Sequence, residues 1–252
     1  MSQALPNLSP VNVRQGTAAD IAAASIDALI LVLPKDKLPP RTAFPYRDEI
    51  ARLRKQQPEA ELFGFSVADE RPVHVVAGFA KADATAFERL TLARKLAAEA
   101  LRVNPATVGA YAALAPNADA AAEALAAALL AAAFRLPRFK RELSPVPRFK
   151  TIRLFHPRKL DLSRTAAAAA GNNFARWVTA LPANHLTPEN YRTLLKELAE
   201  QEGLGFEFLD EKALARRGAG AFLAVAQGSS RRDAGIVHLS YRPAKQARTS
   251  GL

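Results

Sequence analysis

The fold class is decided by one stretch, residues 72–114, which reads PVHVVAGFAKADATAFERLTLARKLAAEALRVNPATVGAYAAL. Apolar residues dominate both ends of it, at 72–80 and 106–114, as expected of buried strands. Between them, Thr85 stands where a helix N-cap is expected, and Glu88 occupies the matching capping-box position. The segment that follows carries apolar residues near helical spacing, at Phe87, Leu90, Ala93, Leu96 and Leu101. The stretch therefore predicts strand, helix, strand.

The same alternation continues on both sides of this stretch. Further strands are predicted at ALILVLP (28–34), LFGFSVA (62–68) and KTIRLFH (150–156). A second alanine-rich helix is predicted after Asn117, which we expect to be its N-cap. Strands that alternate with helices of this length favour an α/β layer fold with a mainly parallel sheet. Gly64, Gly78 and Gly109 are isolated, so they indicate close packing rather than a phosphate-binding loop.

From residue 163 the pattern changes to a long helix followed by a smaller α/β segment. Ser163 is the expected N-cap of the long helix, and Pro182 is expected to end that helix. One apolar face is predicted, formed by Ala170, Phe174, Trp177, Val178 and Leu181. Another helix is predicted with Thr187 as N-cap, Pro188 at its first position and Gly203 at its end. After it we expect the strand LGFEFL, short helices in DEKALARRG and AGAFLAVAQGSS, and the strand AGIVHLSYRP.

Composition is that of a globular protein, with 49% hydrophobic and 23% charged residues among 252. The chain has no cysteine, which excludes disulfides, thiolate metal sites and a cysteine nucleophile. The first residues, MSQALPNLSP, do not resemble a signal peptide, and no apolar stretch is strong enough to span a bilayer. We expect a soluble, cytoplasmic protein with no membrane contact.

Positive charge is concentrated in one block, residues 135–159. This block holds nine Lys/Arg and one acidic residue, so it carries +8 of the chain's net charge of +11. Such a block is a candidate for binding nucleic-acid phosphates. The candidate contacts are Arg138, Lys140, Arg141, Arg148 and Lys150. The alternative is a solvated connector, broken by prolines, whose basic side chains simply face water.

The residues that could carry chemistry form no catalytic pattern. The histidines, His74, His156, His185 and His238, include no i, i+4 pair and no H-E-x-x-H motif. Three acidic pairs, at 48–49, 69–70 and 210–211, lie where helices begin or chains turn, and there carboxylates commonly act as caps. Ser229 follows a glycine but lacks the G-x-S-x-G context of a nucleophile. Asn172 and Asn173 lie mid-helix and are expected to bond a neighbouring loop or a partner subunit.

The last eighty residues resemble the leucyl (cytosol) aminopeptidase family. The family pattern N-x-P-x-N-x-L-T-P is matched by LPANHLTP, 181–188, although Ala180 stands where the family has its first Asn. A later pattern, G-x-G-x-x-x-x-V-x-x-G-S, is matched by Gly218, Gly220, Val225, Gly228 and Ser229. Within LPANHLTP we expect Asn184 to bond backbone, and we expect no catalytic role for His185.

The resemblance implies a domain plan and an activity. It implies an N-terminal α/β domain over 1–160 that contains the basic connector 135–159, a linking helix over 161–182, and the first part of a catalytic domain over 183–252. Family members are hexamers that remove N-terminal residues, often leucine, from peptides. Two divalent metals, zinc or manganese, activate the attacking water, and a lysine and an arginine assist.

The segments that hold those metals are not found in the 252 residues. The family places them in G-K-G-x-x-x-D-x-G-G and N-T-D-A-E-G-R motifs, and neither occurs here. We therefore assign no catalytic and no metal-ligating residue, and we expect no cofactor and no activity from this chain by itself. Two interpretations stay open: a fragment of a longer aminopeptidase, or a non-catalytic protein that binds a partner subunit or nucleic acid through residues 135–159.

Overall fold

The computed structural model describes residues 5–40, 44–68, 72–114, 117–139 and 148–243. The chain divides into two compact units. The larger unit is Leu8–Trp177, and the smaller unit is Val178–Leu252 together with Met1–Asn7. Each has its own sheet, so each is described by itself.

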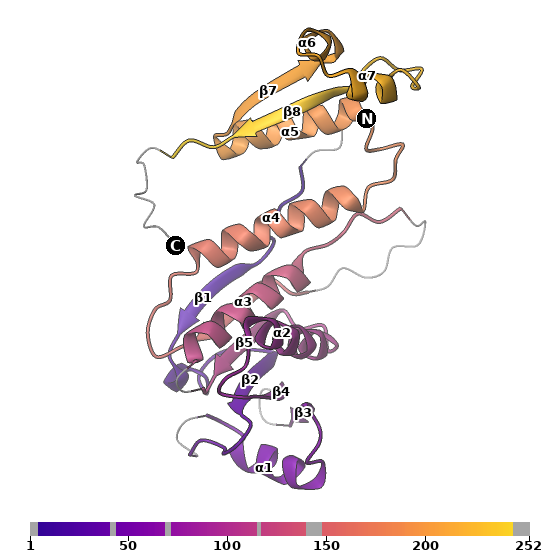
Figure 1. Ribbon diagram of the computed structural model, residues 1–252. Helices are drawn as coiled ribbons and strands as arrows, with labels where there is room; N and C mark the ends of the chain where they lie inside the picture. The colour runs from indigo at the N-terminus through magenta and orange to yellow at the C-terminus, as the bar shows by residue number, and fades with distance from the viewer. Residues whose placement is uncertain (1–4, 41–43, 69–71, 115–116, 140–147, 244–252) are drawn as a thin grey trace. The chain divides into compact units, whose positions relative to one another are not determined.

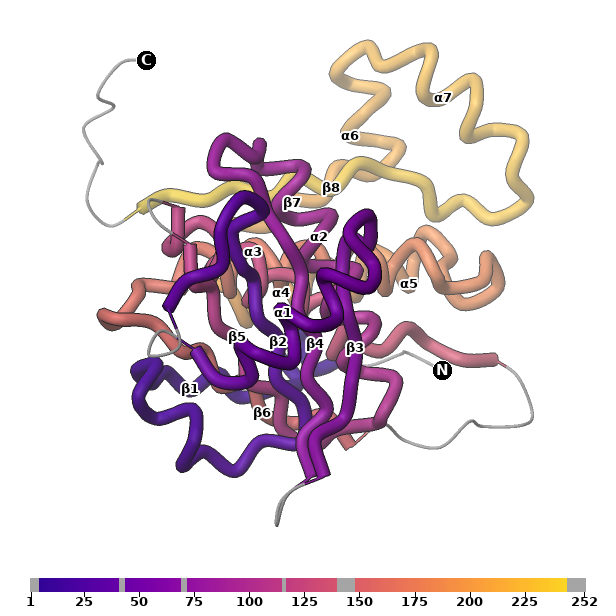
Figure 2. Tube along the Cα trace, turned by 90° about the horizontal axis from the view of Figure 1, so that it is seen from below, coloured from indigo at the N-terminus to yellow at the C-terminus, as the bar shows by residue number. Residues whose placement is uncertain are grey.

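The larger unit is built on a six-stranded sheet. Its strands lie in the order β1 (Asn12–Gly16), β6 (Thr151–Phe155), β5 (Thr107–Ala112), β2 (Ala28–Pro34), β4 (Val73–Ala80) and β3 (Leu62–Val67) (Figure 2). All neighbouring pairs are parallel except β3 with β4, which is antiparallel. The prediction of a mainly parallel sheet in an α/β fold is confirmed.

Strand β2 shows why the sheet lies in the middle of the unit. Its side chains alternate between two apolar clusters, with Ile30 and Val32 in one and Leu29, Leu31 and Leu33 in the other. Both faces of the sheet are therefore covered, as a continuous apolar strand requires.

Helices cover the two faces of this sheet unequally. Helices α2 (Ala86–Leu101) and α3 (Ala118–Ala133) pack on one face, and α1 (Arg47–Gln56) packs on the other through Ile50 (Figure 1). A short 3-10 turn, η1 (Ala18–Asp20), follows β1. The predicted capping box of α2 is present, because Glu88 N donates to Thr85 Oγ1 at 3.2 Å and Thr85 N donates back to Glu88 at 2.7 Å.

The predicted apolar face of α2 is wrong at its start. Ala93 and Leu96 are buried, whereas Phe87 is 78% exposed and Leu90 is 41% exposed. Phe87 stands in the first turn of the helix, close to the point where the strands beneath it end. Helical spacing identifies residues on one side of a helix, but it does not show how far the sheet extends below them.

Two predicted N-caps also differ. Asn117 stands at the cap position of α3, but its amide donates to Ala82 O instead of capping the helix. In α4 (Ser163–Thr179), Ser163 is already helical, and its backbone N–H donates to Asp161 Oδ1 at 2.9 Å. That hydrogen bond lowers the pKa of Asp161 below its ordinary value. The first-turn N–H group thus has a carboxylate partner where a hydroxyl was expected.

The buried residues of α4 also differ in part from the prediction. Trp177 and Val178 are buried as expected, whereas Ala170 and Phe174 are only half-buried. Ala169 and Asn173 are buried in their place.

The smaller unit follows the predicted order of elements. Helix α5 (Pro188–Glu202) precedes β7 (Gly205–Asp210), α6 (Glu211–Arg216), α7 (Gly220–Ala226) and β8 (Gly235–Ser240), and β7 pairs antiparallel with β8. Thr187 caps α5, and Gly203 ends it with a positive φ of 65°. None of the helices in the described ranges is long and apolar enough to cross a membrane.

Candidate functional site

The Leu181–Pro188 segment is a structural joint. The backbone N–H groups of His185 and Leu186 both donate to Pro182 O, at 2.8 and 2.9 Å, which closes a turn. Asn190 then ties this turn to α5, because its side chain donates to His185 O at 3.0 Å. Asn184 is exposed, and no hydrogen bond of its side chain is found in the described part of the chain. The hydrogen bond to backbone that was expected of Asn184 is made by Asn190 instead.

The residues of the glycine-rich pattern in the smaller unit also lie at turns and helix ends. Gly218 follows α6 with φ of 72°, a conformation that favours glycine, and Gly220 begins α7. Ser229 Oγ accepts a hydrogen bond from the backbone N–H of Arg231 at 3.2 Å. Its hydroxyl therefore stabilises a local turn and has the geometry of an ST-turn.

His74 and His238 lie in strands, as predicted. His74 Nδ1 is 3.2 Å from the hydroxyl of Ser66 on the neighbouring strand β3. His238 is mostly exposed on β8, with Nδ1 3.4 Å from Glu207 of β7. Each makes a cross-strand contact within its own sheet.

The buried His156 contacts Asp119 and Arg158 in a cluster that the sequence did not reveal. Its Nε2 lies 3.0 Å from Asp119 Oδ1, although the two are not aligned as a hydrogen bond, and the imidazole is only 3% exposed. Its Nδ1 lies 3.0 Å from Arg158 O, and the Arg158 guanidinium pairs with the other oxygen of Asp119. The cluster ties the segment after β6 to the first turn of α3.

One signal could have identified this cluster. Asp119 follows β5 and His156 follows β6, and the carboxyl ends of adjacent parallel strands meet at the same edge of a sheet. Pairing the two strands in advance would have placed the two side chains together. Their contacts hold the segment after β6 against the first turn of α3.

The acidic residues serve helix starts and ion pairs. Asp48 and Glu49 lie in the first turn of α1, and Asp210 caps α6 by accepting from Ala213 N at 2.7 Å. Glu211 pairs with Arg232. The pair at 69–70 lies outside the described residues.

A dinuclear metal site needs several carboxylate or imidazole ligands around one point. Within the residues that the structure describes, no group of three or more His, Asp or Glu could hold a metal ion. The two metals implied by the resemblance therefore do not fit these residues.

Three of the five candidate nucleic-acid contacts lie in the described ranges. Arg138 is exposed after α3, and Arg148 and Lys150 are exposed on either side of the buried Phe149, directly before β6. Lys140 and Arg141 lie outside the described residues.

Comparison with known proteins places a family signature in the C-terminal part of the chain. Residues 173–252 match the sequence model of the cytosol aminopeptidase family, catalytic domain. A probable cytosol aminopeptidase of Corynebacterium diphtheriae is 44% identical over 71 residues, which are 28% of this chain and 14% of that protein. One of Parasynechococcus marenigrum is 34% identical over 177 residues, which are 67% of this chain and 35% of that protein.

Solved structures show the same fold over nearly the whole chain. A mutant tomato leucine aminopeptidase superposes with a TM-score of 0.77 at 16% identity, over 96% of this chain and 53% of that one. The bottromycin maturation enzyme BotP in complex with Mn superposes with a TM-score of 0.64 at 23% identity, over 87% of this chain and 46% of that one. This chain therefore spans about half the length of the solved structures that it resembles and a smaller share of the curated relatives.

Proposed function

Because residues 173–252 match the sequence model of the cytosol aminopeptidase family, we propose that this chain supplies the first half of a metal-dependent aminopeptidase. The activity is the release of N-terminal amino acids, often leucine, from peptides. The observation that carries the proposal is the family match over α5, β7, α6, α7 and β8, the elements that follow LPANHLTP. The relatives are named cytosol aminopeptidases, which supports a cytosolic location. A hexameric assembly belongs to the proposal through the family resemblance alone.

The proposed division of the chain into parts follows the family resemblance. Residues 1–160 form the N-terminal domain, 161–182 the linking helix, and 183–252 the beginning of the catalytic domain. Two divalent metals would supply Lewis-acid chemistry in the complete aminopeptidase, and the described residues offer no ligand set for them. From the motifs missing in the sequence, we expect this chain by itself to hold no metal pair and not to catalyse.

The coding sequence beyond codon 252 tests this proposal directly. We expect an in-frame continuation that encodes the G-K-G-x-x-x-D-x-G-G and N-T-D-A-E-G-R segments. A continuation without carboxylate-bearing motifs of this kind, or a stop codon at that point, would contradict it.

A second candidate function is nucleic-acid binding through residues 135–159. The observation that favours it is the exposure of Arg138, Arg148 and Lys150 in a block of charge +8. Binding that depends on phosphate contacts falls steeply as salt rises.

Charge reversal tests this candidate. Replacing Arg138, Lys140, Arg148 and Lys150 by Glu is expected to abolish binding to duplex DNA at low salt, measured by fluorescence anisotropy. Lys212→Glu, an exposed reversal in the smaller unit, is the control and is expected to leave binding unchanged. Affinity that survives the fourfold reversal excludes the block.

A further inference from the structure

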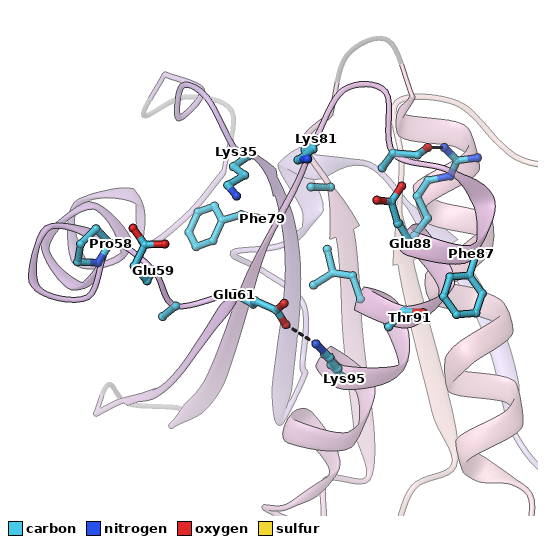
Figure 3. A pocket seen from close by; sticks show the side chains of 15 residues that line it. Lys35, Pro58, Glu59, Glu61, Phe79, Lys81, Phe87, Glu88, Thr91 and Lys95 are labelled. Carbon is cyan, nitrogen blue, oxygen red and sulfur yellow. Dashed lines mark hydrogen bonds and ion pairs between the residues drawn. The ribbon is translucent and has the colours of Figure 1, made fainter.

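A pocket lies at the carboxyl ends of β2 and β4 in the larger unit. Its volume is about 280 Å³, close to the lower end of the range of roughly 300–1,000 Å³ typical of small-ligand sites. Lys35, which follows β2, and Lys81, which follows β4, stand on its wall together with the first turns of α2 (Figure 3). A pocket of this volume suits a ligand of the size of one amino acid.

The topology of the sheet determines where the chain runs at this end of β2 and β4. Strands β2 and β4 are parallel neighbours, but the chain leaves β2 toward α1 on one face and leaves β4 toward α2 on the other. The pocket lies at the strand ends from which these two connections start. In open α/β sheets, ligands characteristically bind outside the carboxyl ends of the strands.

The apolar wall of the pocket is held rigidly. Phe79 packs edge-on against Phe63 with ring centroids 5.7 Å apart, and the guanidinium of Arg54 lies 4.8 Å from the Phe79 ring centroid. Arg54 also donates to Lys35 O, which fixes the backbone that carries this lysine. On the opposite side, Leu92 and the exposed Phe87 of α2 complete the apolar lining.

Some of the charged groups of the lining are already engaged. Glu61 pairs with Lys95 across the pocket, as Figure 3 shows, and Arg89 donates to Ala84 O. Glu88 accepts from Thr85, and the first turn of α2 is thereby capped from within the chain.

Other charged groups of the lining have no direct contact with a charged side chain. Among the described residues, the ammonium groups of Lys35 and Lys81 and the carboxylate of Glu59 make no direct hydrogen bond or ion pair; Lys35 and Lys81 act only at longer range, adding minor contributions to the lowered pKa of Glu61 and of Glu88. Charges that are exposed on a pocket wall and uncommitted are available to a ligand. The pocket therefore offers positive and negative charge beside an apolar wall.

The pocket thus has uncommitted cations, an uncommitted carboxylate and a rigid apolar surface. A ligand complementary to all three has a carboxylate, an ammonium group and an apolar side chain. We propose that this pocket binds an apolar α-amino acid as its zwitterion, with the carboxylate at Lys35 and Lys81, the ammonium at Glu59, and the side chain against Phe79 and Leu92. The proposal goes beyond the aminopeptidase function and does not depend on it, because the pocket lies outside residues 173–252.

Calorimetric titration of the full chain with L-leucine tests the proposal. We expect saturable binding at one site. L-Leucinamide, which lacks the carboxylate, and N-acetyl-L-leucine, which lacks the ammonium, are each expected to bind at least about tenfold more weakly, since each loses a charge-assisted contact. Absence of saturable leucine binding, or equal binding of all three compounds, overturns the proposal.

Matched variants place the binding in the pocket. Lys81→Glu is expected to weaken leucine binding at least about tenfold, whereas Lys81→Arg retains it and shows that the fold is intact. Arg94→Glu, an exposed reversal on α2 that does not line the pocket, is expected to leave binding unchanged.

The acidic partner is tested separately with Glu59→Gln. This change is expected to weaken leucine binding while leaving the weaker binding of N-acetyl-L-leucine unaltered. For the cationic side of the pocket, leucine binding that keeps full affinity in Lys81→Glu contradicts the assignment of Lys81 to the ligand carboxylate.

Discussion

Asn173 shows how a single polar side chain can organise a helix face. It is 1% exposed, and its amide donates to Leu8 O at 3.1 Å, so it ties α4 to the segment before β1. The sequence correctly predicted that one of the two mid-helix asparagines bonds a neighbouring loop. It could not tell which of the two is buried, because the apolar spacing does not include either residue.

Asn173→Ala is expected to destabilise the protein by about 1–3 kcal/mol, because a buried hydrogen bond is lost and its acceptor is left without this partner. Urea denaturation measures the change. Asn172→Ala, at the exposed neighbouring position, is the control and is expected to stay within about 0.5 kcal/mol of the wild type. Equal effects of the two substitutions would show that burial at residue 173 does not matter.

Glu88 provides a pH-dependent contribution to stability. Hydrogen bonds from the backbone and then the hydroxyl of Thr85 lower the pKa of Glu88 below its ordinary value, and Lys81 and Arg89 add smaller effects in the same direction. A lowered folded-state pKa gives stability that is fully present above the unfolded-state pKa of about 4.3. This stability is lost as pH falls through the folded-state pKa.

Glu88→Gln removes this titration but keeps a side chain that can accept from Thr85 N. The variant is therefore expected to lose less stability than the wild type between neutral pH and pH values below about 4. Glu123→Gln, which removes an exposed carboxylate on α3, controls for the change in net charge. Denaturation curves recorded across this pH range give the comparison, and parallel curves for Glu88→Gln and the wild type would refute it.

At the scale of elements, the predictions that succeeded rest on the pattern of apolar residues and on helix-capping residues. The continuous apolar run of β2 and the Thr187-Pro188 start of α5 each carry a direct physical signal, and both elements formed as predicted. Strand β1 and helix α1 were missed. Strand β1 is largely exposed along its length, and α1 buries only Ile50, so neither has the apolar pattern by which a sequence predicts an element.

The pairing of β7 with β8 depends on a close approach at Gly235. A Cβ at this position would lie 2.6 Å from Leu209 O and 2.4 Å from the Phe208 ring. The backbone carbonyl cannot move without disturbing the ladder that pairs Asp210 with Gly235.

Gly235→Ala is expected to destabilise the smaller unit by about 1–3 kcal/mol through this overpacking. Amide hydrogen exchange in β7 and β8 is expected to accelerate. Gly220→Ala is the control, because no atom beyond its chain neighbours and its own helix backbone lies within 4 Å of the added Cβ, and alanine favours the helix that starts there. Unchanged exchange in Gly235→Ala would show that the sheet tolerates the contact.

At the scale of the whole molecule, the sequence predicted the fold class and the family but not the clusters that depend on long-range pairing. The order of the six strands, and with it the His156–Asp119 contact and the pocket at the carboxyl ends of β2 and β4, follows from the tertiary arrangement. The family match covers the last 80 residues, whereas the structural likeness extends over 96% of the chain.

This chain has the fold of part of a leucine aminopeptidase, and we propose that it does not catalyse by itself. Hydrolysis of a leucine arylamide by the purified 252-residue chain, with Mn²⁺ or Zn²⁺ added, measures this directly. We predict a rate no greater than that of the metal ions alone, with a complete leucine aminopeptidase turning over in parallel as the control. Metal-dependent turnover by the 252-residue chain, abolished by a chelator, would contradict the claim.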